Sequence, residues 1–243
     1  IMKDKHAKLS KRNGDASFED LVAKGYLSEA IINYIALLGW APKGEREIYS
    51  LEELKQEFDI EGLSKSPSIF DPLKLRAING EYIRMLTPEK FLEYATPYIR
   101  ESVKREDVDL SKISALLQNR TEVFTDIPEQ VDFIDEMPNY DLALYENKKM
   151  KTNCDTALDA LTRSLPVMEA IEDWRFDVLH DALFKLIADM GVKNGYVLWP
   201  VRVAISGKQF TPGGAFEIAE IIGKDDTIAR MKRSIEMLKN RAN

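Results

Sequence analysis

The chain has 243 residues, of which 44% are hydrophobic and 31% are charged, a composition typical of a water-soluble globular protein with one large or two smaller domains. Its longest apolar run, 30–41, is too short to cross a membrane and is interrupted by Asn33. The formal net charge of −7, taken alone, argues against a nucleic-acid partner, because neutralising phosphates requires clustered lysine and arginine.

Short helices are expected along the first half of the chain. A basic, loop-like stretch over 1–15 comes first and ends near an Asn-Gly turn signal. Ser50 and Glu53 form the capping-box pattern that begins a helix, and Thr87 is expected as another N-cap, followed by Pro88. Apolar residues at helical spacing predict helices over 18–24, 28–38, 73–83 and 87–98.

The charged stretch 100–109 is the expected domain boundary. Beyond it, apolar periodicity predicts helices over 110–124, 127–134, 155–170, 175–190, 215–222 and 225–239. Residues 199–205 allow two interpretations, because their apolar residues alternate as in a strand, whereas Pro200 could open a helix that ends at Gly207. No apolar runs typical of a parallel sheet lie between the helices, so the predicted fold class is mainly α.

The negative charge is concentrated in one segment. Between Thr121 and Glu146 there are eight acidic residues and no basic one, so the rest of the chain carries a net charge of +1. Residues 1–15 hold five basic and two acidic residues, and 191–243 hold nine and five. The chain can therefore present basic surfaces at two separate places, although solvated helix faces would have the same composition. The acidic segment lacks the spacing of a calcium loop and is expected to be a solvated face.

Most other reactive residues form no recognisable site. A single cysteine, Cys154, excludes an intramolecular disulfide, and with only two histidines, His6 and His180, a four-ligand zinc site is not expected. His180 lies beside an apolar stripe and is expected at a helix edge. Gly213-Gly214 follows no predicted strand and is expected to be a turn rather than a phosphate-binding loop. No Ser/His/Asp or Cys/His set occurs at motif spacing.

One basic loop has the composition of a phosphate clamp. It contains two lysines three positions apart, a hydroxyl between them and an adjacent arginine, in the order Lys8, Leu9, Ser10, Lys11 and Arg12. Such a cationic loop can stabilise charge that develops on a phosphate chain. The arrangement resembles the KMSKS loop of class I aminoacyl-tRNA synthetases.

Longer segments extend this resemblance along nearly the whole chain. They read KLSKRNG (8–14), GYLSEAIINYIALLGW (25–40), LSKSPSIFDPLKLRAINGEYIR (63–84), RTEVFTDIPEQ (120–130) and LWPVRVAISGKQFTPGGAFEIAEIIGKDDTIARM (198–231). The first three, in this order and spacing, are similar to the bacterial glutamyl-tRNA synthetase family just after its nucleotide-binding fold. The last two resemble that family's C-terminal anticodon-binding domain. One departure is Ala77, where the family usually has an aromatic residue, which affects a packing contact rather than a function.

The resemblance implies three consecutive regions. Residues 1–15 would end a catalytic domain, 16–108 would form a helical stem-contact domain, and 109–243 would form an all-helical anticodon-binding cage with subdomains of about 109–150 and 151–243. The family's HIGH-type motif and dinucleotide-type fold would precede Ile1, so the chain is expected to start inside a longer polypeptide that holds the missing N-terminal catalytic domain. The resemblance further implies a cytoplasmic monomer without a membrane segment.

The resemblance also implies a reaction. In this family, glutamate is activated with ATP and magnesium as glutamyl-adenylate and is then passed to the 3′ end of glutamate tRNA. Carried onto this sequence, Lys8 and Lys11 would contact ATP, with Lys11 the stronger candidate of the two. Without the catalytic domain these lysines have nothing to clamp, so the chain alone is expected to be inactive and to hold no bound cofactor.

Four cations are the expected tRNA contacts. Lys74 and Arg76 would bind phosphates at the inside corner of the tRNA, with exposed helix cations as the competing interpretation. The arginines of R-x-x-x-F-x-x-I-P-E and W-P-x-R, Arg120 and Arg202, match family positions that contact the unstacked anticodon bases. A salt bridge from Arg202 to the acidic segment is the alternative for that residue.

Two competing functions stay open at the level of the sequence. A helical protein-interaction scaffold that binds no RNA would fit the net charge of −7. A glutaminyl enzyme is the other alternative, but the distal half of that family resembles β-barrels, and the strand-poor C-terminal half of this chain argues against it.

Overall fold

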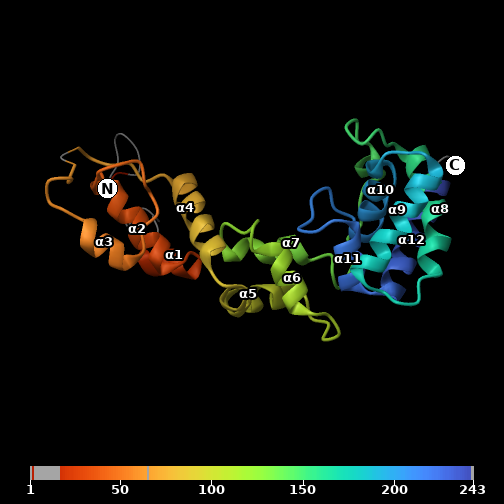
Figure 1. Ribbon diagram of the computed structural model, residues 1–243, viewed down its shortest axis with the longest axis horizontal. Coiled ribbons are helices and arrows are strands. Elements are labelled where there is room, and N and C mark those ends of the chain that lie inside the picture. The colour runs from red at the N-terminus through yellow and green to blue at the C-terminus, as the bar shows by residue number, and fades with distance from the viewer. Residues whose placement is uncertain (1, 3–16, 65, 242–243) are drawn as a thin grey trace. The chain divides into compact units, whose positions relative to one another are not determined.

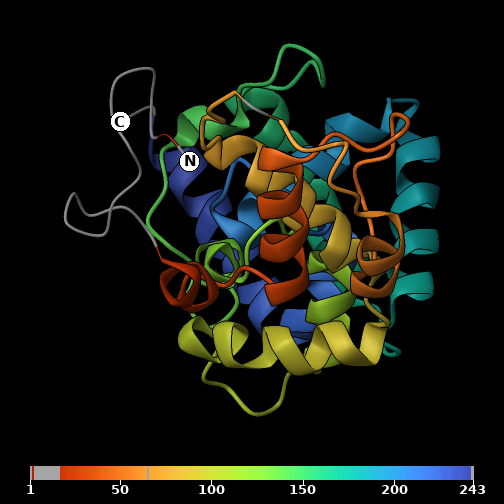
Figure 2. The same ribbon diagram turned by 90° about the vertical axis from the view of Figure 1, so that its left-hand side faces the viewer.

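The computed structural model describes residues 2, 17–64 and 66–241, and every regular element in these ranges is a helix (Figures 1 and 2). Pairing of extended backbone in the same ranges is limited to isolated bridges such as Asn147 with Thr152. The chain divides into two compact units, a first unit of residues 1–98 and 114–127 and a second unit of 99–113 and 128–243. The mainly α class predicted from the sequence is confirmed. The predicted domain boundaries stay predictions.

The first unit is built from short helices, and side-chain capping sets the start of most of them. Its helices are α1 (Phe18–Ala23), α2 (Ser28–Gly39), α3 (Leu51–Glu57), α4 (Pro72–Met85) and most of α5 (Pro88–Ser102). Ser17 and Ser50 each complete a capping box, and the Asp71 side chain accepts hydrogen bonds from the first turn of α4. α2 packs against α4 through buried apolar residues that include Ile31 and Ile78.

A buried asparagine joins three segments of the first unit. Asn79 on α4 is fully buried, and its Oδ1 accepts a hydrogen bond of 2.8 Å from the backbone N of Leu27, where α2 begins. The same side chain donates from Nδ2 to the carbonyl of Glu122. Because a buried amide needs partners for both of its ends, Asn79 fixes the segment around Glu122 against α4.

The helix predicted over 110–124 ends early. α6 (Leu110–Leu117) is followed by a turn and by the short 3-10 helix η2 (Phe124–Asp126), and α7 (Ile127–Val131) is shorter than the predicted 127–134. The Thr121 hydroxyl donates to the Leu117 carbonyl at 2.9 Å, and the Phe124 N donates to the Gly25 carbonyl at 3.2 Å. The Phe124 N thus has a long-range partner in place of the Arg120 carbonyl that a continued helix would offer it.

The second unit contains a set of longer helices. Beyond the 3-10 helix η3 (Leu142–Tyr145) these are α8 (Cys154–Glu169), α9 (Phe176–Met190), α10 (Asn194–Ser206), α11 (Ala215–Ile222) and α12 (Lys224–Asn240). α8 lies beside α9, α10 and α12 (Figure 1). Side chains such as Leu161, Leu183 and Val201 fill the space between them. No helix among the described residues is both long and apolar enough to cross a membrane.

Residues 199–205 are helical rather than a strand, but Pro200 does not open the helix, because α10 begins at Asn194. α10 contains Pro200 and stops at Gly207, which has φ +64°, a left-handed conformation that favours glycine. A Cβ at Gly207 would lie 3.1 Å from Cδ1 of Tyr140 and 3.2 Å from Pro138, so space as well as φ requires glycine here. This sharp stop starts the loop 208–214, which leads into α11.

Candidate functional site

The loop expected to contact ATP cannot be described geometrically. Lys8, Leu9, Ser10, Lys11 and Arg12 all lie outside the described residues. The site described below therefore rests on the expected tRNA contacts and on their neighbours.

Arg120 is an exposed cation in the turn that follows α6. Its backbone N donates to the Leu117 carbonyl at 2.9 Å, which closes that turn. Its guanidinium makes no hydrogen bond or ion pair with the part of the chain that the structure describes. All five N–H donors of the side chain are therefore free to bind a ligand.

The segment after Arg120 is held by close packing. Phe124 is buried and stacks on Tyr98, with ring centroids 5.7 Å apart, and on Phe91 at the same distance. Gly25 allows the close approach of this segment, since a Cβ there would lie 2.9 Å from the backbone N of Thr125. The turn that carries Arg120 thus ends in a rigid aromatic cluster.

Lys74 and Arg76 on α4 are both paired with acids. Nζ of Lys74 lies 2.5 Å from Oε1 of Glu47. Arg76 binds two acids of the acidic segment, with Nε 3.1 Å from Glu122 and Nη2 2.6 Å from Asp126, and the hydrogen bond that it donates to Asp126 raises the pKa of the guanidinium. A phosphate at either cation would have to share it with a carboxylate.

The acidic segment differs from the solvated face that the sequence predicts. Besides the two acids bound to Arg76, Asp132 binds Nζ of Lys208 at 2.8 Å, and Oδ2 of Asp135 accepts from the backbone N of Lys104. Several of its charges are therefore used inside the fold. The sequence could not show this, because the partners lie up to 76 residues away.

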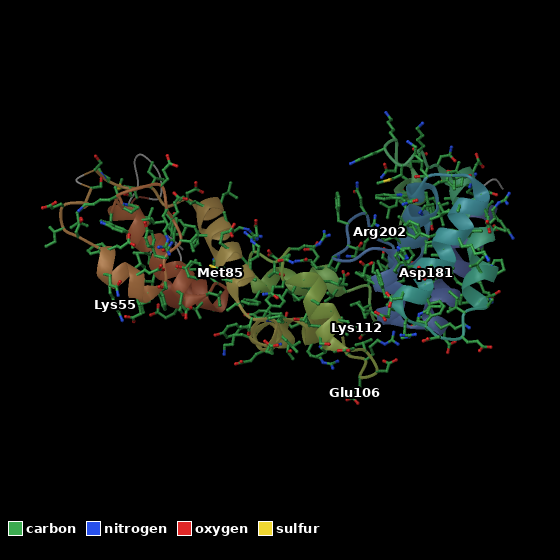
Figure 3. All side chains as sticks on the ribbon, in the orientation of Figure 1. Lys55, Met85, Glu106, Lys112, Asp181 and Arg202 are labelled. Carbon is green, nitrogen blue, oxygen red and sulfur yellow. The ribbon has the colours of Figure 1, made fainter. Side chains whose placement is uncertain are left out.

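Arg202 lies on α10 and is tied to the loop that follows the helix (Figure 3). Its Nη2 donates to the Gln209 carbonyl at 2.9 Å and its Nη1 to Oγ1 of Thr211 at 2.8 Å. The guanidinium carbon lies 4.5 Å from the centroid of the Trp199 ring, a cation–π geometry, and burial lowers the pKa of the side chain. The salt bridge to the acidic segment considered for Arg202 is absent from the described residues. Lys208 makes one in its place.

Two further surface features were missed from the sequence. Phe210, in the loop that Arg202 holds, is 82% exposed. A turn bridged by Asn147 and Thr152 carries three exposed lysines with no ion pair to any described residue, and Lys193 adds a fourth beside it: Lys148, Lys149, Lys151 and Lys193. An aromatic residue between turn-forming residues, and the run KKMK, were the available signals.

Two family models match the chain. One, described as the anticodon binding domain, matches residues 90–235. The other, described as the catalytic domain of class I tRNA synthetases (E and Q), matches residues 1–77.

The similar proteins are glutamate–tRNA ligases. The chain is 57% identical over 238 residues to that of Clostridium acetobutylicum, covering 98% of this chain and 49% of the relative. It is 57% identical over 243 residues to that of Clostridium tetani, covering 100% of this chain and 50% of the relative. The chain thus spans about half the length of these curated relatives.

Two solved structures share the fold. One is a glutamate tRNA ligase from Elizabethkingia meningosepticum in complex with its amino acid, with a TM-score of 0.81, 26% identity, and coverage of 98% of this chain and 50% of that chain. The other is the glutamate-tRNA synthetase of Elizabethkingia anophelis, with a TM-score of 0.78, 25% identity, and coverage of 97% and 49%.

Proposed function

Because this chain belongs to the anticodon-binding domain family and corresponds to the C-terminal half of glutamate–tRNA ligases, we propose that it is the half that binds glutamate tRNA. The whole ligase would attach glutamate to that tRNA with ATP and magnesium through glutamyl-adenylate. In that reaction Lys8 and Lys11 would stabilise the α-phosphate and the leaving pyrophosphate. The protein would act as a cytoplasmic monomer.

The observation that carries the proposal is the state of Arg120. In a chain of net charge −7, and directly before the acidic segment, its guanidinium is exposed and bonded to none of the described residues. The packing of Phe124 and Asn79 fixes the backbone beside it. A free guanidinium on a fixed backbone has the properties required to read a base edge.

The donor-only character of arginine suggests which base Arg120 reads. O2 and N3 of a cytosine both accept hydrogen bonds, whereas the Watson–Crick edge of guanine presents donors beside its acceptor. Glutamate anticodons end in C and glutamine anticodons end in G. We propose that Arg120 reads that third base, so the whole ligase would reject glutamine tRNA.

Each unit offers its own RNA contacts. Arg202 is the proposed anticodon contact of the second unit, although its two terminal nitrogens already hold the loop 208–214. Lys74 and Arg76 are proposed to contact stem phosphates by exchanging or sharing their carboxylate partners. Such an exchange is feasible because surface ion pairs contribute little free energy.

Filter binding of the chain to glutamate tRNA and to an unrelated tRNA, at two salt concentrations, tests the proposal. We expect glutamate tRNA to bind more tightly than the unrelated tRNA, and binding to both to weaken with salt as phosphate contacts are lost. The protein-interaction scaffold predicts no tRNA binding. Equal affinity for the two tRNAs, or none, would reject the proposal.

A further inference from the structure

Phe210 has the most exposed aromatic side chain among the described residues. Its side chain is 82% exposed, whereas other exposed aromatic residues such as Phe58 reach 46%. An exposed phenyl ring gains nothing from the hydrophobic effect that stabilises a core residue. Folding therefore does not occupy this ring, which leaves it available to a ligand.

The backbone on both sides of Phe210 is fixed. Arg202 donates to the carbonyl of Gln209 on one side, at 2.9 Å, and to Oγ1 of Thr211 on the other, at 2.8 Å. Oγ1 of Thr211 in turn donates to the Gly213 carbonyl at 2.7 Å. The loop thus holds the ring in the solvent and cannot fold over it. Because the loop is already ordered, a ligand that binds there does not have to order it.

The surroundings favour a planar ligand that tolerates positive charge. The guanidinium of Arg202 lies 4.5 Å from the centroid of the Trp199 ring, and Lys208, which is paired with Asp132, begins the loop. Unpaired RNA bases stack on exposed aromatic side chains, since every base has a π-face, and their phosphates are attracted by nearby cations. A protein partner would also bury the ring, but it would not need a cation such as Arg202 beside the ring.

We propose that Phe210 is a stacking platform for one unpaired base of the RNA loop that the second unit binds. The proposal rests on the proposed function, because it assumes that this unit holds an anticodon. Arg202 acts here as a positioning residue, since it holds the two neighbours of Phe210.

The test is a binding cycle with the full chain and glutamate tRNA. Three tRNAs each lack one anticodon base, replaced by an abasic nucleotide, and each is titrated against the wild type, Phe210→Ala, Phe210→Trp and Gln209→Ala. We expect Phe210→Ala to weaken binding of the intact tRNA by roughly 5- to 100-fold with an unchanged salt slope. Phe210→Trp should bind at least as tightly as the wild type. Gln209→Ala is the matched control, because its side chain is exposed and its carbonyl is kept, and it should bind like the wild type.

The abasic tRNAs distinguish stacking on Phe210 from a structural role of this residue. At one anticodon position, removing the base should cost the wild type affinity but cost Phe210→Ala almost none, because the stacking partner is already gone. Losses that add at all three positions, or a Phe210→Ala variant that binds like the wild type, would overturn the stacking role while leaving tRNA binding intact. Failure of the wild type itself to bind glutamate tRNA would instead reject the proposed function. A Phe210→Ala variant that changes oligomeric state without changing tRNA affinity would identify a protein contact and overturn the proposal.

Discussion

Arginine has opposite roles at two positions of this chain. Arg230 is 8% exposed and donates to the carbonyls of Phe133, Ile134 and Ile205 at 2.7 to 2.9 Å. Arg120 is exposed and bonds to no described residue. Arg230 therefore stabilises the second unit, whereas the Arg120 side chain is free to bind a ligand.

Replacing Arg230 with Met should destabilise the second unit. Three buried carbonyls would lose their donor, and each unsatisfied buried acceptor costs about 1–3 kcal/mol, so a loss of at least about 3 kcal/mol is expected. Urea unfolding followed by circular dichroism measures it. Arg233→Met is the control, since its exposed guanidinium binds Oδ1 of Asn139, and it should change the free energy of unfolding by less than about 0.5 kcal/mol. Equal losses in the two variants would contradict this role of Arg230.

Arg120→Gln should narrow the preference for C over G at the third anticodon base. A lost bidentate pair is worth about 1–3 kcal/mol of discrimination, by analogy with base-edge contacts in duplexes. The measurement is a titration with two tRNAs that differ only in that base. Arg202→Gln should weaken binding to both tRNAs and leave their ratio nearly unchanged. An unchanged ratio in Arg120→Gln would remove Arg120 from the reading of this base.

The candidate contacts could be located from the sequence, but their bonding could not. The motifs around Arg120 and Arg202 give their positions, because a motif fixes spacing along the chain. Whether a cation is free depends on distant residues, such as the acids 46 and 50 positions from Arg76. The exposure of Phe210 depends likewise on the bonds that Arg202 makes with its loop.

Among the elements, the loop at Gly25 combines a left-handed backbone with a close backbone contact. Its φ is +85°, and an added Cβ would lie 2.9 Å from the Thr125 backbone. Gly25→Ala should lower the free energy of unfolding by about 2 kcal/mol, since the left-handed conformation alone costs about 1–2 kcal/mol in a residue with a Cβ. It should also weaken tRNA binding, because the Gly25 carbonyl accepts from Phe124, close to Arg120.

Gly39→Ala is the matched control for that variant. Gly39 is the last residue of α2, and an added Cβ would meet nothing within 4 Å. Alanine should therefore stabilise the chain by up to about 0.5–1 kcal/mol. Thermal or urea unfolding distinguishes the pair, and two destabilised variants would show that the loop at Gly25 is not special.

The start of α3 gives a dependence on pH. Hydrogen bonds from Arg46 and from the Ser50 backbone lower the pKa of Glu53 to about 2. A carboxyl whose pKa is lower in the folded state adds stability above its unfolded value of about 4.3, and this is lost as pH falls towards 2. Glu53→Gln should therefore flatten the fall in stability of the first unit between pH 4.5 and 2. Urea unfolding across this range measures it, and parallel profiles for variant and wild type would contradict it.

Helix starts were more predictable than helix ends. The Ser50–Glu53 capping box predicted from the sequence is present, and Oγ1 of Thr87 accepts from the Lys90 backbone as an N-cap would. These contacts are local. The end of α6 depends on long-range contacts instead, since Asn79 and Gly25 bind the segment beyond the helix. An apolar period continues through such a segment even where tertiary bonds break the helix.

For the whole molecule, internal pairing of acids reconciles a net charge of −7 with the proposed RNA binding. The acidic segment binds Arg76, Lys208 and backbone N–H groups within the unit to which each acid belongs. Exposed cations such as Arg120 and the lysines around 148–151 stay without a partner among the described residues. Total charge is therefore a weaker guide than the local bonding of each charge.

We propose above all that this chain holds glutamate tRNA by its anticodon. The most direct measurement compares the affinity for that tRNA with the affinity for the same tRNA in which all three anticodon bases are replaced, at two salt concentrations. We expect the replacement to weaken binding roughly tenfold or more at both, because base contacts carry specificity while phosphate contacts carry the salt dependence. Equal affinities for the two tRNAs at both salt concentrations would contradict the claim.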